Sequence, residues 1–178
     1  MNINKRDVLI RRIEDNDFSV IEAMEEIAGN DDMLIVEELS PMFNQKSDIV
    51  EYMGWIAEYQ GELQGYLIAF RIKKLSYLTA VVRCVVDINA QRNGIGSLLM
   101  AKVEPEEQGH KTTIECDDEG YAALSFLASL GYIVTQAIEP EYDLDGEKAW
   151  NGSFVLTKEK RQVLELKNRL AMYPYHGE

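Results

Sequence analysis

A hexamer near the middle of the chain has residue types and spacing suited to binding a phosphate group. Its residues are Gln91, Arg92, Asn93, Gly94, Ile95 and Gly96. The hexamer joins an apolar run rich in β-branched residues, 78–88, to a run that favours a helix, 95–104. A helix that begins at such a loop presents free backbone N–H groups, and glycines let a phosphate approach without interference from a Cβ. The hexamer is therefore suited to an anionic cofactor, with a tight turn as the alternative.

Side chains that could move a proton follow this loop. Glu115 and Asp117 alternate along a predicted strand, 111–117, so they share one face. Either carboxylate could accept a proton from a substrate, with a solvent-facing strand end as the alternative. Tyr121 lies beside the next predicted helix and could donate a proton, with an ordinary surface tyrosine as the alternative.

The two cysteines are predicted to be buried, reduced thiols. Cys84 is not expected to act as a nucleophile, because its neighbours offer no histidine base and apolar burial raises the pKa of a thiol. We therefore expect no covalent intermediate on Cys84. Only His110 and His176 could join Cys84 and Cys116 as ligands, so no metal site is predicted.

The spacing of apolar residues predicts strands alternating with helices. Strands are predicted at 8–13, 54–59, 63–72, 78–88, 111–117, 132–138 and 153–157. Helices are predicted at 17–28, from Ser47, and at 95–104, 120–130 and 158–172. Polar loops are predicted at 30–43 and 139–152, and Gly131 is predicted to end a helix. Together with a hairpin turn at 60–62, this order indicates one α/β domain with a mixed sheet.

Composition excludes some classes of partner. The chain has 178 residues and a net charge of −13, so it lacks the basic surface that nucleic acids need. An acidic field favours a cationic partner, with simple solubility as the alternative. The sequence has no apolar run that could span a membrane and no apolar core of a signal peptide, so we expect no membrane partner and a cytoplasmic location.

The hexamer resembles the acetyl-coenzyme A loop of the GNAT superfamily of N-acetyltransferases, (Gln or Arg)-x-x-Gly-x-(Gly or Ala). Residues 8–28 resemble the family's opening strand and helix, 55–72 its central hairpin, and 122–132 its A-x-x-F-x-x-x-G-F helix and turn. The likeness covers roughly residues 8–157. It implies a single-domain GNAT fold, in which a mixed, mostly antiparallel sheet is flanked by helices and splays between its fourth and fifth strands.

The resemblance also implies a reaction. Acetyl-coenzyme A would be the co-substrate, with its pyrophosphate on the backbone of residues 91–96 and Arg92 as a further phosphate partner. The backbone of Cys84 and Val86 would face the pantetheine arm and the thioester. The acceptor would be the primary amine of a small molecule or peptide, and the acidic segments favour a cationic one.

The chain departs from the family at positions that often carry catalysis. Leu127 stands where a tyrosine acid is frequent, Ala80 where some relatives have a glutamate base, and Gly120 where an asparagine is common. Glu115, Asp117 and Tyr121 are therefore the replacement candidates, and Glu37 and Glu38 could shape the acceptor site. The alternative is a catalytically weak or inactive coenzyme A sensor or interaction domain. The predicted terminal helix could form a homodimer.

Overall fold

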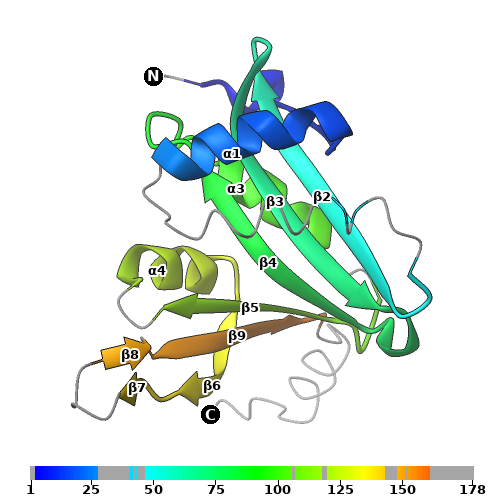
Figure 1. The fold of residues 1–178 in the computed structure, drawn as a ribbon, viewed down its shortest axis with the longest axis vertical. Helices are drawn as coiled ribbons and strands as arrows, with labels where there is room; N and C mark the ends of the chain where they lie inside the picture. Colours follow the sequence, from blue (N-terminus) through cyan, green and yellow to red (C-terminus); the bar gives the residue numbers. More distant parts are fainter. Residues whose placement is uncertain are drawn as a thin grey trace, which may run out of the picture.

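A computed structural model describes residues 3–27, 41, 43, 47–105, 107–117, 120–142, 148–150 and 152–160. The described chain forms a seven-stranded sheet in the order β1-β2-β3-β4-β5-β9-β6 and a separate β7-β8 pair (Figure 1). The strands are β1 (Leu9–Arg12), β2 (Val50–Tyr59), β3 (Glu62–Ile72), β4 (Leu78–Val86), β5 (Lys111–Asp117), β6 (Ile133–Ile138), β7 (Glu141–Tyr142), β8 (Lys148–Trp150) and β9 (Ser153–Glu159). The helices are α1 (Phe18–Ile27), α3 (Ile95–Met100) and α4 (Tyr121–Ser129), with 3-10 turns η1 (Lys5–Asp7), η2 (Asp15–Asp17), η3 (Lys73–Leu75) and η4 (Ala101–Val103).

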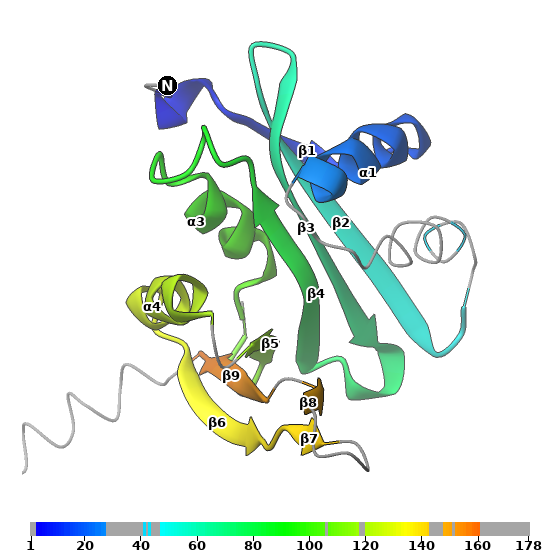
Figure 2. The ribbon, with the colours of Figure 1, turned by 60° about the vertical axis from the view of Figure 1, so that its left-hand side comes forward.

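Helices cover both faces of the sheet. Figure 2 shows α3 and α4 on one side of the strands and α1 on the other. Leu99 of α3 and Leu127 of α4 belong to the larger core cluster, together with Leu67 of β3. Ile21 of α1 belongs to a second cluster with Ile68 of the same strand. Because β2 and β3 are covered on both faces, every residue in the centre of each strand is buried. A strand buried on both faces has a continuous apolar run, whereas a strand with one face in solvent alternates apolar and polar residues.

The sheet splits where β4 meets β5. All other neighbouring strands in it are antiparallel, but β4 and β5 run parallel and pair only over residues 78–81 and 111–114. Val82 is left without a partner on β3, because Arg83 pairs with Ile68 while Val81 pairs with Ala69. Such a bulge bends the strand and increases its twist, and the two strands diverge beyond it (Figure 1). The predicted mixed sheet with a splay between its fourth and fifth strands is confirmed.

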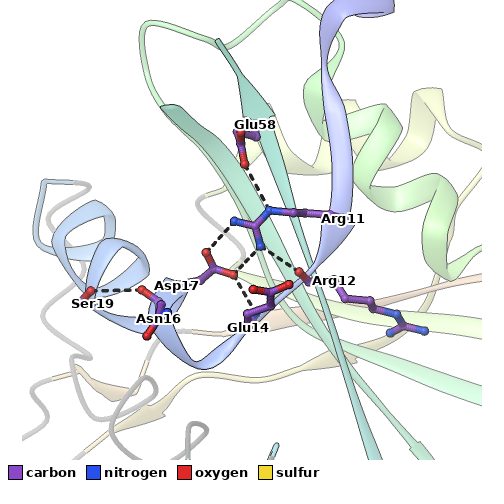
Figure 3. Close-up of polar contacts among 7 residues, drawn as sticks. All are labelled: Arg11, Arg12, Glu14, Asn16, Asp17, Ser19 and Glu58. Atoms are coloured by element: carbon purple, nitrogen blue, oxygen red, sulfur yellow. Dashed lines mark hydrogen bonds and ion pairs between the residues drawn. The ribbon is translucent and has the colours of Figure 1, made fainter. Parts of the chain in front are cut away.

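An ion-pair network fixes the start of α1 against the hairpin (Figure 3). Arg11 of β1 donates to both carboxylate oxygens of Asp17, at 2.7 and 2.8 Å, and to Glu58 of β2 at 3.2 Å. Asp17 also accepts the backbone N–H of Glu14 at 2.7 Å. The hydrogen bonds from Arg11, followed by that from Glu14, lower the pKa of the Asp17 carboxyl against the opposing effect of burial.

Three predicted elements are corrected by the structure. Residues 47–49 form a bend, not a helix: the Ser47 hydroxyl accepts the N–H groups of Ile49 and Val50, each at 3.1 Å, and β2 begins at Val50. The helix predicted to 104 ends at Met100 and continues as the 3-10 turn η4. The predicted loop 139–152 contains β7 and β8.

The predicted end of the chain is only partly described. Residues 158 and 159, assigned to a terminal helix by the sequence pattern, belong to β9, and Lys160 is not helical. Residues 161–172 of the predicted helix lie outside the described residues. Within the described part, no helix is long and apolar enough to cross a membrane.

Candidate active site

The loop between β4 and α3 is held by its own side chains. Gln91 donates from its amide to the carbonyl of Val86 at 3.3 Å. Asn93 donates to the carbonyls of Ala90 and Gln91, both at 3.1 Å. The side chains of Gln91 and Asn93 thus shape the loop, which leaves its backbone N–H groups as the part that could meet a phosphate.

Two residues of the loop have positive φ angles. Arg92 has φ 64° and Gly94, the N-cap of α3, has φ 79°. A positive φ costs little for glycine but is uncommon for arginine, so this loop is in a conformation that the surrounding structure must hold. A Cβ at Gly94 would overlap the Cε and Nζ atoms of Lys5. The Lys5 side chain therefore lies directly over Gly94, and the approach of a phosphate to this glycine stays a prediction.

Gly96 has a packing role in addition to the cofactor contact that its place in the motif implies. A Cβ at Gly96 would lie 3.0 Å from Cζ of Phe126 in α4, closer than side chains normally tolerate. The second glycine therefore lets α3 pack directly against α4. Ile95, also predicted as a cofactor residue, is 1% exposed and anchors the first turn of α3 in the core. Contact of Gly96 and Ile95 with a cofactor stays a prediction, and it would involve their backbone.

The N-terminal segment lies against the loop. The N–H of Ile3 donates to the side-chain oxygen of Asn93 at 3.2 Å, and the Ile3 side chain is buried in the larger core cluster. This anchor places Lys5 over Gly94, on the same loop as Arg92. In the described part of the chain, neither Lys5 nor Arg92 has a carboxylate partner. The sequence analysis missed Lys5, because no local pattern links it to a loop almost ninety residues away.

Beyond the bulge, the backbone of β4 has no partner strand on its β5 side, within the described sheet. Cys84 and Val86 lie on this stretch, as predicted. The Cys84 side chain packs against the larger core cluster, and burial raises the pKa of its thiol to about 12. At neutral pH the group is a neutral thiol, which is a poor nucleophile. The geometry supports the expectation that Cys84 takes no acyl group.

A buried ion pair that the sequence analysis missed lies beside the bulge on the α1 face. Arg83 of β4 donates to both oxygens of Glu25 in α1, at 2.6 and 3.0 Å. Glu25 is 2% exposed, so its charge depends on this bidentate partner. The pair fixes α1 to the stretch of β4 that borders the splay.

The three predicted catalytic residues do not converge on one face. Glu115 and Asp117 are exposed on the same side of β5, and Glu115 accepts a hydrogen bond from the Ser153 hydroxyl of β9. Ile114 and Cys116 face the other side, where they pack on the core that includes α4. Tyr121 is 76% exposed in the first turn of α4. The carboxylates therefore share a face, as predicted, and α4 lies on the opposite face. Glu37 and Glu38 lie outside the described residues.

Packing explains two of the departures from the family pattern. Leu127 is 2% exposed and fills the core between α4 and the sheet. A Cβ at Gly120 would come 3.0 Å from Sγ of Cys116 and 3.1 Å from the carbonyl oxygen of Asp117, so an asparagine would not fit there without a shift. Tyr132, in the turn after α4, has a buried hydroxyl for which the described residues provide no hydrogen-bond partner, and burial raises its pKa.

Known proteins share this architecture. A model of the acetyltransferase (GNAT) family matches residues 20–132. No curated protein sequence matches the chain significantly. The ribosomal-protein-S18-alanine N-acetyltransferase of Escherichia coli is 18% identical, with 88% of this chain and 96% of that chain covered and a TM-score of 0.66.

Two further solved structures show the same fold. The protein yncA of Salmonella typhimurium, solved with its cofactor acetyl-CoA, is 15% identical over 88% of this chain and 96% of that chain, with a TM-score of 0.66. Mutant forms of the spermidine/spermine N-acetyltransferase of Vibrio cholerae are 13% identical over 93% and 99% of the two chains, also at 0.66. The family match spans more than half of the sequence, and the splayed sheet agrees with it. The chain therefore belongs to the acetyltransferase (GNAT) family, whose acetyl donor is acetyl-coenzyme A.

Proposed function

We propose that this protein is an N-acetyltransferase that moves the acetyl group of acetyl-coenzyme A directly to a primary amine of a small molecule or peptide. The observation that carries the proposal is the opening between β4 and β5, which begins beyond Val81 and leads to the loop with its positive φ angles at Arg92 and Gly94. A strand edge without a partner strand and a loop with two left-handed residues thus occur in the same region of the fold.

The residues of the loop fit the phosphates of the donor. Lys5 and Arg92 supply two cations without carboxylate partners in the described chain, and the Lys5 side chain lies directly over Gly94. Charge-assisted hydrogen bonds of lysine or arginine to phosphate are stronger than neutral ones. Acetyl-coenzyme A, when bound, supplies the thioester that an amine attacks. Backbone N–H groups of residues 82–86 that face the splay would then stabilise negative charge on the carbonyl oxygen.

The acceptor amine must lose a proton before or during attack. We assign this task to Glu115 or Asp117, which are exposed on one face of β5 next to the opening. Tyr121, exposed on the opposite side, is retained as a candidate for returning a proton to the departing thiolate. Carboxylates on the acceptor side favour a cationic amine. The polyamine and ribosomal-protein acetyltransferases of the same fold are named for amine substrates of those proteins.

A thiol-release assay with matched binding data tests the proposal. Isothermal titration measures binding of acetyl-coenzyme A, and a thiol reagent follows release of coenzyme A over a panel of polyamines, peptides and uncharged amines. Binding together with amine-dependent thiol release is the expected result. Glu115→Gln and Asp117→Asn should lower kcat more than they change the Kd of acetyl-coenzyme A. Absence of binding would contradict the proposal.

The second candidate is a coenzyme A sensor with little or no transferase activity. Leu127 favours it, because a side chain packed in the core at the frequent tyrosine position cannot donate a proton. Binding of acetyl-coenzyme A with no thiol release for any amine would favour the sensor over the enzyme.

A further inference from the structure

A polar cavity opens on the α3 face of the sheet, past the end of η4. Its volume is about 300 Å³. It is lined by side chains of the strands β1 to β5 and by residues 102–105, 107 and 110, which lie between α3 and β5. It exists because α3 has only six residues and η4 ends at Val103, so helix does not extend over this end of the sheet (Figure 2). The loop at Gly94 precedes α3 and Lys102 follows it, so the cavity and the cofactor loop lie at opposite ends of this helix.

Two arginines line the cavity without a carboxylate partner. The Arg12 guanidinium lies 4.1 Å over the centre of the Trp55 ring. Arg71 donates from Nε and Nη2 to the hydroxyl of Thr79, at 3.4 and 3.3 Å. Within the described residues neither arginine forms an ion pair. Each guanidinium is therefore held in place by a neutral group, which fixes its position and leaves its charge unbalanced.

The other charges around the cavity are mostly neutralised by local pairs. Glu104 pairs with Lys158, Glu107 with His110, and Lys111 with Glu159. With His110 neutral, the charges left are those of Arg12, Arg71 and Lys102 on one side and those of Glu51 and Glu107 on the other. Glu51 faces Arg71 in the register of β2 and β3 but does not approach it within ion-pair distance. A surplus of positive charge in one cavity is unexpected in a chain with a net charge of −13.

The geometry points to this cavity as a binding site for a small organic anion that carries a carboxylate or phosphate group. A guanidinium presents a rigid fork of N–H donors that matches either oxyanion, and two unpaired forks suit a dianion or two separate anionic groups. The volume is at the lower end of small-molecule pockets, which limits the ligand to a short chain or a single ring. The Trp55 ring beneath Arg12 gives such a ligand an apolar surface. This site is independent of the proposed transferase function.

Titration calorimetry and thermal shift with defined anions test this site. The probes are inorganic phosphate, citrate and phenyl phosphate, with benzyl alcohol as the uncharged control. Saturable binding of at least one anion is expected. Comparing the Kd values of the three probes shows whether the site prefers free phosphate, a carboxylate or an aromatic phosphate. Arg71→Gln and Arg12→Gln should each raise its Kd at least tenfold, whereas the matched Arg6→Gln, in η1 at the N-terminal segment, should leave it unchanged.

A second titration distinguishes anion binding in the cavity from anion binding at the cofactor loop. The same titration with acetyl-coenzyme A present should give an unchanged Kd, because α3 separates the two places. Arg71→Lys keeps the charge but loses the fork and should bind more weakly than wild type, and melting curves show whether each variant is folded. The inference is overturned if no anion binds wild type, if Arg6→Gln loses as much affinity as Arg12→Gln, or if acetyl-coenzyme A displaces the anion.

Discussion

Replacing Lys5 by methionine should weaken binding of acetyl-coenzyme A while leaving the fold intact. The side chain lies against Gly94, where a Cβ would overlap it, so its ammonium is within reach of a phosphate on that loop. A cation about 4 Å from an anion gains about 1 kcal/mol in water and about 4 kcal/mol at an effective dielectric constant near 20. Because Lys5 is exposed, the lower end applies, and about 1–1.4 kcal/mol corresponds to a roughly five- to tenfold rise in Kd.

Calorimetric titration of wild type, Lys5→Met, Lys5→Arg and the control Arg6→Met measures this effect. Methionine keeps an unbranched stem over Gly94, and Arg6 lies in the same 3-10 turn, so the comparison isolates the charge at position 5. Lys5→Arg should restore most of the affinity, and added salt should reduce the difference between wild type and Lys5→Met. A similar loss with dephospho-coenzyme A would assign the contact to the pyrophosphate. An unchanged Kd for Lys5→Met, or an equal loss for Arg6→Met, would refute the role of Lys5.

Three further predictions concern titratable groups. Asp17→Asn should lower the free energy of unfolding by about 1–3 kcal/mol at neutral pH. Because Arg11 lowers the pKa of Asp17 in the folded state, the extra stability of the wild type is present above the ordinary pKa of an aspartate and is lost as the pH falls through the folded-state pKa, which urea titrations at several pH values would show. A Cys84→Ala enzyme should keep its kcat for amine acetylation within a few-fold, since the thiol stays neutral; loss of all turnover with acetyl-coenzyme A binding intact would contradict direct transfer. Tyr132→Phe should leave stability unchanged or raise it by up to about 1 kcal/mol, because the hydroxyl it removes has no described partner, and a large loss in urea unfolding would show a missed hydrogen bond.

The sequence predicted elements well where a local pattern, such as an apolar strand run or a helix-ending glycine, was unambiguous. The run 111–117 has strand boundaries identical to those of β5, and Gly131 ends α4 with φ 88° as expected. The segment from Ser47 was wrong because a short apolar run fits helix and strand periods equally, and pairing along β3 decides for a strand. The periodicity of the helix does not record its early end: residues 101–103 form the 3-10 turn η4, and Glu104, which precedes Pro105, is extended.

The site was predictable only where it is local in sequence. The β4–loop–α3 order and the left-handed glycine follow from neighbouring residues, so the hexamer was found. Lys5 over Gly94 and the bond between Arg83 and Glu25 join distant segments, and no spacing in one sequence reveals them. The packing of Gly96 against the Phe126 ring of α4 could not be predicted for the same reason. The predicted homodimer and the roles of the three catalytic candidates stay predictions.

Hydrogen exchange with and without acetyl-coenzyme A tests most directly whether the donor lies in the splay between β4 and β5. We predict slower exchange of backbone amides at residues 82–86 and 92–96 when acetyl-coenzyme A is bound, since these groups would meet the pantetheine arm and the phosphates. The amides of residues 55–58 in β2, where this strand is paired with both β1 and β3, should be unaffected. Saturating binding without protection at residues 82–86 and 92–96 would contradict the account.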